Sequence, residues 1–243
     1  MKDVEIGVQT YTYRQFDLAG IARELKGTGI TALEIWTRHL GPEAPPKERQ
    51  AARKLLAGAG LRVCGVGVCN FKDQVEARAT LSFAAELGAD YVSIDLDPKD
   101  DAHKRMLAGL AKEYGLLLGI HNHGPGHHFD TAESVLKACE GFDNVLGACV
   151  DTGHFLRVGQ TAEHVIRTLG RRVHAVHLKD FIDAETEVVP GTGKLDYAVA
   201  FKALKDHTDF HGAFVIEYEA NADDPTPSMK QTVRVLKEAL AKA

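Results

Sequence analysis

Hydrophobic and polar positions follow a pattern along this chain that repeats about every 30 residues. Short apolar runs alternate with longer amphipathic stretches rich in Ala, Leu, Lys and Glu. Runs of about four to eight apolar residues are typical of buried strands, and the longer stretches are typical of helices. Eight strands are expected: Val4–Thr10, Ala32–Trp36, Arg62–Val68, Tyr91–Asp95, Leu116–His121, Val145–Asp151, Val173–Leu178 and Ala213–Glu217. The clearest helices are expected over Pro46–Ala59, Gln74–Leu87, Ala102–Tyr114 and Thr131–Cys139.

Several of these helices approach the next strand through a glycine, as in AGAGLRV, ELGADYV and EYGLLLG. A glycine just past a helix caps it and turns the chain back toward a strand. Repeated strand, helix and glycine units predict parallel strands joined by right-handed crossovers. Eight units favour a (β/α)₈ barrel over a doubly wound open sheet, because the first loop, TYTYRQF, lacks a glycine fingerprint.

No linker divides the chain, so we expect one barrel domain over residues 1–243, with the longest insertion at 181–193. A formal net charge of −5 offers no basic surface for nucleic acid. No apolar run has transmembrane length and the N-terminus has no signal core, so a cytoplasmic protein is expected, although a removed signal peptide would leave no trace. Cys64, Cys69, Cys139 and Cys149 form no CxxC pair and are expected to be reduced and buried.

The last four expected strands each end in residues that can bind a metal ion. Strand side chains alternate in direction, and barrel active sites lie at the C-terminal strand ends. His177 therefore points inward whereas His174 points outward. By the same alternation the other inward sets end in His121 and His123, in Asp151, and in Glu217 and Glu219. Taken singly these residues could be loop, cap or surface residues, but together they indicate a shared metal centre.

Two histidines and two carboxylates suit Mn²⁺, Co²⁺, Zn²⁺ or Fe²⁺ better than Ca²⁺. We favour a single Mn²⁺ ion, with Mg²⁺ as a further alternative. Four protein ligands leave two positions open on an octahedral ion, where the carbonyl and hydroxyl oxygens of a sugar would bind. The ion would then act as a Lewis acid and stabilise an enediolate after a proton is removed next to the carbonyl.

Supporting roles are expected for residues around these strand ends. Glu34 ends the second strand and could hold a substrate hydroxyl or act as a base, while Trp36 could stack on a sugar or pack at the rim. Lys179 could stabilise an oxyanion or form a solvated pair with Asp180. His154, three residues beyond Asp151, is a catalytic candidate. Substrate contacts are assigned to His123, Arg157 and Glu219.

The backbone N–H groups of residues 191–193 could hold an anion, although a plain turn is favoured there. His127 and His128 lie in a polar loop and receive no role.

The order of ALEIW, GIHNHG, DTGHF, HLKD, GxGxLD and IEYE resembles the xylose isomerase-like TIM-barrel superfamily, in particular its sugar phosphate isomerase and epimerase group. The resemblance covers essentially the whole chain. It implies a divalent metal ion at the ends of strands five to eight. The ligands it implies are His121, Asp151, His177 and Glu217.

One residue departs from the ketose 3-epimerases of that superfamily, which have a glutamate at the position of His121. In those enzymes two glutamates exchange protons with opposite faces of the substrate. A histidine instead favours proton abstraction from one side, followed by loss of a β-substituent. The HNHGP and EYExNxDxP patterns also resemble barrels that cleave 3-keto-glycosides.

The sequence therefore predicts a metal-dependent enzyme that acts on a small carbohydrate through an enediolate. An isomerase or epimerase is the leading hypothesis, with Glu217 as ligand and base, and a 3-keto-glycoside lyase is the alternative. An abasic-site endonuclease is disfavoured by the net charge. A non-catalytic sugar-binding barrel and a homo-oligomer remain open.

Overall fold

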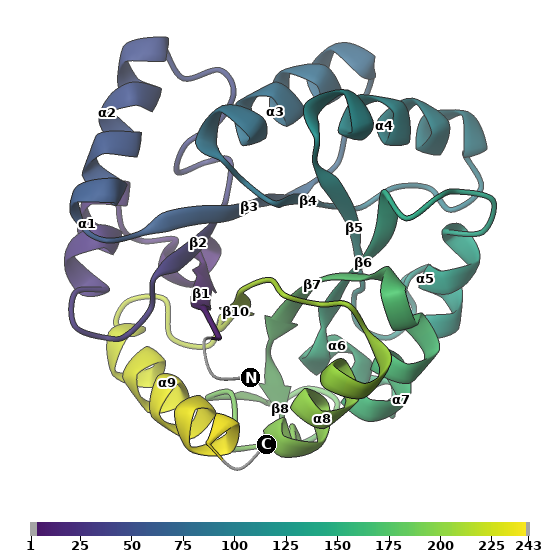
Figure 1. Ribbon diagram of the computed structural model, residues 1–243. Helices are drawn as coiled ribbons and strands as arrows, with labels where there is room; N and C mark the ends of the chain where they lie inside the picture. The colour runs from purple at the N-terminus through teal and green to yellow at the C-terminus, as the bar shows by residue number, and fades with distance from the viewer. Residues whose placement is uncertain (1–3, 242–243) are drawn as a thin grey trace.

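The computed structural model describes residues 4–241 and shows eight parallel strands closed into a barrel with helices around it (Figure 1). The strands pair in the order β1-β10-β7-β6-β5-β4-β3-β2. This arrangement confirms the predicted (β/α)₈ barrel. The barrel strands are β1 (Ile6–Gln9), β2 (Ala32–Ile35), β3 (Arg62–Cys69), β4 (Tyr91–Ile94), β5 (Leu117–His121), β6 (Leu146–Asp151), β7 (Val173–Leu178) and β10 (Phe214–Ile216).

The helices between the strands begin and end at residues suited to those places. Asp73 and Asp100 cap helix N-termini with their carboxylates, and Gly88 and Gly115 end the same two helices with φ of 76° and 68°. The α-helices are α1 (Leu18–Glu24), α2 (Pro46–Gly58), α3 (Gln74–Leu87), α4 (Asp101–Tyr114), α5 (Ala132–Ala138), α6 (Thr152–Arg157), α7 (Ala162–Leu169), α8 (Tyr197–His207) and α9 (Thr226–Leu240). Short 3-10 turns are η1 (Thr10–Tyr13) and η2 (Gly170–Arg172).

The main hydrophobic core lies between the barrel and its helices. The barrel interior holds two smaller buried groups, Ala32, Cys64, Ala213 and Val215 in one and Tyr91, Cys149 and Ala175 in the other. All four cysteines of the chain are buried free thiols, as expected. Within residues 4–241, no helix combines the length and apolar character that a bilayer crossing needs.

Two segments near the barrel mouth differ from the expected pattern. The eighth barrel strand, β10, ends at Ile216, so Glu217 lies just beyond it, although its N–H still donates to Leu178 at 3.2 Å. The expected insertion after β7 contains a short antiparallel hairpin, in which β8 (Asp180–Phe181) pairs with β9 (Glu187–Val188). The strand pattern does not reveal this hairpin, because each of its strands has only two residues.

Candidate functional site

Four side chains meet at the C-terminal end of the barrel, where the sequence predicts a metal centre. One nitrogen or oxygen atom from each of His121, Asp151, His177 and Glu217 lies within 4.8 Å of the others. All four residues are buried. They come from β5, β6, β7 and the position after β10, and Asp151 and His177 are direct partners in the sheet. Outside this cluster, His174 donates to the carbonyl of Leu118 at 2.9 Å, on the opposite face of β7.

The potential ligand atoms converge on a small volume. Nε2 of His121 is 3.2 Å from Nδ1 of His177, 3.7 Å from Oε2 of Glu217 and 3.8 Å from Oδ2 of Asp151. Nδ1 of His177 is 2.7 Å from Oε2 of Glu217. Adjacent ligands of an octahedral ion are about 3 Å apart when each lies about 2.1 Å from it. The cluster is therefore close to the spacing that a single ion requires.

Two buried polar atoms in this cluster have no hydrogen-bond partner in the described structure, namely Oδ2 of Asp151 and Nδ1 of His121. The other carboxylate oxygen of Asp151 accepts the N–H of His154 and caps α6, so only Oδ2 remains for another partner. A buried carboxylate oxygen without a donor is costly. A cation at the centre of the cluster would remove that cost, so these residues fit a divalent metal ion.

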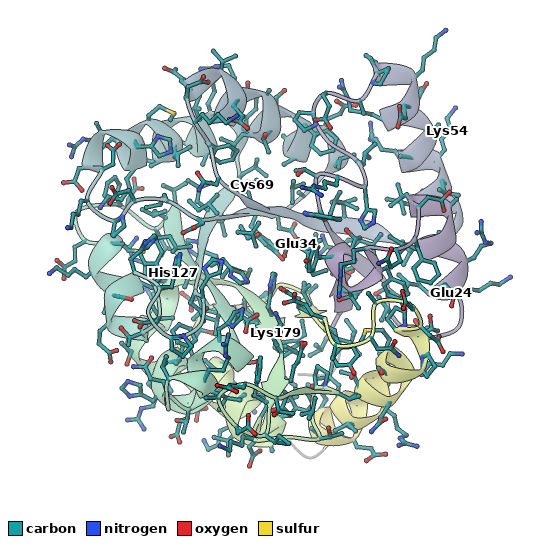
Figure 2. The ribbon with its side chains drawn as sticks, turned by 180° about the vertical axis from the view of Figure 1, so that it is seen from behind. Glu24, Glu34, Lys54, Cys69, His127 and Lys179 are labelled. Atoms are coloured by element: carbon teal, nitrogen blue, oxygen red, sulfur yellow. The ribbon has the colours of Figure 1, made fainter. Side chains whose placement is uncertain are left out.

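Glu34, for which a substrate contact or a role as base is expected, is enclosed by side chains of the protein next to the cluster. The side chain is fully buried, and Nε2 of His177 donates to its Oε2 at 2.5 Å. Gln9 and Ser93 donate to Oε1 at 3.1 and 2.6 Å, and the hydroxyl of Tyr91 donates to Oε2. With its oxygens occupied, Glu34 orients His177 and directs Nδ1 toward the other ligand atoms. Figure 2 shows Glu34 near the centre of the barrel.

Lys179 supplies a buried positive charge beside the cluster. Its ammonium donates to Oε1 of Glu217 at 3.0 Å and to Glu219, and it lies 3.9 Å from Asp151. Burial alone would raise the pKa of Glu217, but the Lys179 ammonium and the imidazoles of His121 and His177 lower it well below its usual value. Glu217 is therefore ionised at neutral pH.

His154 and Arg157 form a pair at the edge of the site. An N–H of Arg157 lies 3.2 Å from Nδ1 of His154. A guanidinium only donates, so Nδ1 accepts and the proton of the neutral ring is on Nε2. Burial lowers the pKa of His154 and keeps the ring neutral. His154 thus offers an N–H donor beside His121, whose ring centroid is 6.1 Å away.

His123 and Trp36 occupy two further parts of the mouth. The ring of His123 lies between those of His121 and His127, with centroids at 4.9 and 4.3 Å. Burial and neighbouring imidazoles lower the pKa of His123 to about 4. Trp36 is half-buried at the rim and packs edge-on against Tyr11 with centroids 4.9 Å apart.

Asp180 explains the glycine-rich segment that follows the hairpin. Its carboxylate accepts the backbone N–H groups of Gly191, Gly193 and Leu195 at 3.0, 2.8 and 2.9 Å, and that of Phe181 at 2.9 Å. A side chain of the protein therefore accepts the hydrogen bonds of these N–H groups, for which the sequence favours a plain turn over a site for a bound anion. Asp180 is fully buried, so it is not part of a solvated pair with Lys179.

Glu187 on β9 is a titratable residue that the sequence patterns did not single out. Both of its carboxylate oxygens accept the N–H of Glu219, at 3.1 and 3.2 Å. Burial raises the pKa of Glu187 to about 7, despite the opposing effect of Lys179. Glu187 is close to Lys179 and Glu219 only in the folded hairpin, so the sequence alone does not indicate it.

A family model described as xylose isomerase-like TIM barrel matches residues 22–239. The chain belongs to the xylose isomerase-like TIM barrel family. The expected superfamily resemblance is thus confirmed by a match over most of the chain.

Relatives of this family member carry names from carbohydrate and dehydratase chemistry. An inosose dehydratase of Clostridium perfringens is 31% identical over 132 residues, covering 46% of this chain and 44% of that protein. The chain thus matches less than half the length of that relative. A solved protein of Parabacteroides distasonis, described as uncharacterized, is 26% identical with a TM-score of 0.75, covering 98% of both chains. A probable 3-DHS dehydratase from Bacillus anthracis is 14% identical with a TM-score of 0.77, covering 96% and 99%, and shares the fold.

Proposed function

We propose that this protein is a divalent-metal-dependent lyase that eliminates a β-substituent from a keto sugar or a related cyclic ketone. The composition of the buried ligand cluster carries this proposal. It contains one glutamate, Glu217, whereas the ketose 3-epimerases that the chain resembles use two glutamates to exchange protons on both faces of a sugar. Asp151 caps α6 and is fully buried, so Glu217 is the carboxylate left to take a proton. The inosose dehydratase relatives support elimination as the reaction class.

His121, Asp151, His177 and Glu217 would hold the ion, with Mn²⁺ as our first choice among Mn²⁺, Co²⁺, Zn²⁺, Fe²⁺ and Mg²⁺. Bound there, a divalent ion supplies Lewis acidity that stabilises negative charge on the substrate's carbonyl and hydroxyl oxygens.

The protein's own groups divide the remaining work. Glu217 is ionised and takes the proton next to the carbonyl, and the buried Lys179 ammonium stabilises the negative charge that develops. As the C–O bond breaks, the proton held by Glu217 passes to the leaving oxygen, which departs as water or an alcohol, and the Nε2–H of His154 donates a hydrogen bond to that oxygen. Glu34 acts only through His177. Trp36, His123, Arg157 and Glu219 line or border the mouth and are assigned to substrate binding.

An isomerase or epimerase is the second candidate. The observation that favours it is the placement of titratable groups on separate parts of the mouth. His121 and His154 lie on β5 and α6, whereas Lys179 and Glu217 follow β7 and β10. Two such groups could serve different faces of one sugar.

Turnover in deuterated water separates the two reactions. The chelator-stripped protein, reloaded with Mn²⁺, is incubated with a keto-inositol and with a 3-keto-glucoside and followed by NMR. A lyase releases water or an aglycone and forms an unsaturated ketone, whereas an epimerase returns a deuterated sugar with an inverted centre. His177→Ala and Asp151→Ala should abolish both metal binding and turnover, and His174→Gln on the other face of β7 should not. Full activity of the stripped protein would refute metal dependence.

A further inference from the structure

A second group of metal-compatible side chains lies at the rim of the barrel mouth. Asp95 follows directly after β4, while His127 and His128 belong to the loop between β5 and α5. One ligand atom from each lies within 4.8 Å of the others. None of the three belongs to the candidate metal centre. In Figure 2, Glu34 and Lys179 lie near the centre of the barrel, and His127 lies to one side of them.

The spacing within this group suits a tetrahedral ion. Nε2 of His127 is 3.6 Å from Oδ2 of Asp95, and Nε2 of His128 is 3.3 Å from Oδ1. Two ligands bound about 2.0–2.1 Å from a tetrahedral zinc ion lie about 3.3–3.4 Å apart. The three side chains could therefore bind one ion with only small movements.

The loop that carries the two histidines is already fixed in shape. The N–H of His123 donates to the carbonyl of Phe129 at 3.0 Å, which closes the loop, and the Phe129 side chain is fully buried beneath it. Gly126 has a φ of 86°, and its N–H donates to Asp130 at 3.2 Å. A preformed loop loses little conformational entropy when it binds an ion.

We propose that Asp95, His127 and His128 form a second metal site, which binds a zinc-class divalent ion with its fourth position open to solvent. Two imidazoles and one carboxylate favour Zn²⁺, Co²⁺, Ni²⁺ or Cu²⁺ over Mg²⁺ or Ca²⁺. His128 is exposed and the other two residues are half-buried, so the ion exchanges with solvent. When bound, it fastens the loop between β5 and α5 to the end of β4.

Ion pairing without a metal is the competing explanation for this group. In that case Asp95 accepts an N–H from His128 at 3.3 Å and forms a longer ion pair of 3.6 Å with His127. The N–H of Phe129 donates to Nδ1 of His127 at 3.2 Å, which places the proton of the neutral ring on Nε2. Metal binding through Nε2 moves that proton to Nδ1 and gives up this one long hydrogen bond. Metal stoichiometry distinguishes the two explanations.

The second site is separate from the candidate metal centre. The ring of His123 stands between them, 4.9 Å from that of His121 and 4.3 Å from that of His127. We therefore expect each site to bind its ion when the other is disabled, so this inference does not depend on the proposed reaction.

Zinc binding by the full-length, chelator-stripped protein tests the inference, with calorimetry for affinity and elemental analysis for stoichiometry. The wild type should bind two ions, and His128→Ala and Asp95→Asn should each bind one, or bind the second at least about tenfold more weakly. Asp151→Asn should bind only the ion of the second site. Loaded with Co²⁺, it should show an absorption spectrum that disappears in the double variant Asp151→Asn/His128→Ala. His211→Ala, an exposed histidine elsewhere, is the control and should bind two. Unchanged stoichiometry and affinity in both His128→Ala and Asp95→Asn would overturn the second site.

Discussion

At the scale of single residues, Glu34 supports the candidate metal centre through its contact with His177. Its carboxylate fixes the ring of His177 from below through a contact of 2.5 Å. Glu34→Gln keeps an acceptor for that N–H but removes the negative charge that makes Nδ1 a better ligand. We expect metal affinity to fall by about 10–100-fold, measured by calorimetry.

Tyr91→Phe is the matched control for this prediction, because it removes one hydrogen bond to Glu34 and leaves the charge in place. It should weaken metal binding less than Glu34→Gln does. Unchanged metal affinity in Glu34→Gln, together with a lower kcat, would instead assign Glu34 to the substrate.

Lys179 balances the carboxylates of Glu217 and Asp151 in the absence of metal. In Lys179→Met, the methionine fills the space of the aliphatic part of the lysine side chain. The buried carboxylates of Glu217 and Asp151 lose their ammonium partner. We expect the metal-free variant to have a free energy of unfolding about 3 kcal/mol lower than that of the metal-free wild type, measured with urea. Metal should restore part of the loss, since the ion supplies positive charge.

Lys202→Met provides the comparison, because Lys202 forms an exposed pair with Asp206 on α8. Its unfolding free energy should change by no more than about 0.5 kcal/mol. A Lys179→Met variant as stable as Lys202→Met would show that the buried lysine does not carry this charge balance.

The sequence was sufficient to select His177 over His174, because alternation along one strand is a local property. It was not sufficient to assign Glu34. Burial of that carboxylate depends on Gln9, Tyr91 and Ser93, which come from two other strands and meet Glu34 only when the barrel closes. A strand-end glutamate that supports a ligand looks the same in sequence as one that faces a substrate.

At the scale of elements, Asp180 holds the β8–β9 hairpin and the glycine segment in place through four backbone N–H groups. Asp180→Asn has one acceptor oxygen instead of two and leaves some of these N–H groups, of which those of Phe181 and Leu195 are buried, unpaired. We expect a loss of about 1–3 kcal/mol in the free energy of unfolding. Hydrogen exchange should show lost protection at Gly191, Gly193 and Leu195.

The control for that experiment is Asp183→Asn at the exposed tip of the hairpin, where Asp183 accepts the N–H groups of Glu185 and Thr186. In Asp183→Asn, the loss of protection from hydrogen exchange should be confined to the tip of the hairpin. Loss of protection around Gly191 in both variants would mean that the whole hairpin opens together and that Asp180 is not its particular anchor.

Glu187 makes the same hairpin sensitive to pH. Burial raises its pKa from 4.5 to about 7 in the folded protein. Between these values the folded state binds more protons than the unfolded state, so this contribution to stability is complete below pH 4.5 and is lost as pH rises through 7. Glu187→Gln removes the titration. It should match the wild type near pH 4.5 and exceed it at pH 8 by on the order of 1 kcal/mol in urea unfolding.

Glu185→Gln, an exposed neighbour, should follow the wild-type stability at both pH values. An identical pH dependence in Glu187→Gln and the wild type would contradict the assignment. The sequence could not indicate this residue, because a two-residue strand has no periodicity and the raised pKa comes from tertiary burial.

At the scale of the whole molecule, barrel closure brings together residues that are far apart in sequence, since Glu34 and Glu217 both contact His177. The repeating pattern was enough to predict the closed barrel, and a barrel has one C-terminal mouth, so the strand-end ligands could be placed together. The geometry of the loops could not be predicted in this way. That geometry gives Asp180 its hydrogen bonds and brings His127 and His128 close to Asp95.

Metal binding should therefore stabilise the entire fold. A ligand at 100 times its Kd contributes about 2.7 kcal/mol, which corresponds to a rise in Tm of about 5–10 °C for a domain of this size. Burial opposes a charge on His177, but the carboxylate of Glu34 and the hydrogen bond with Glu217 raise the pKa of His177 well above its usual value. A proton on Nδ1 then competes with the ion, and the rise in Tm with Mn²⁺ should be larger at pH 8 than at pH 6. Calorimetric scans of the metal-free and the Mn²⁺-loaded protein would measure this rise in Tm. Asp151→Asn should lose most of the rise, His128→Ala should keep most of it, and an equal rise in wild type and Asp151→Asn would place the stabilising ion elsewhere.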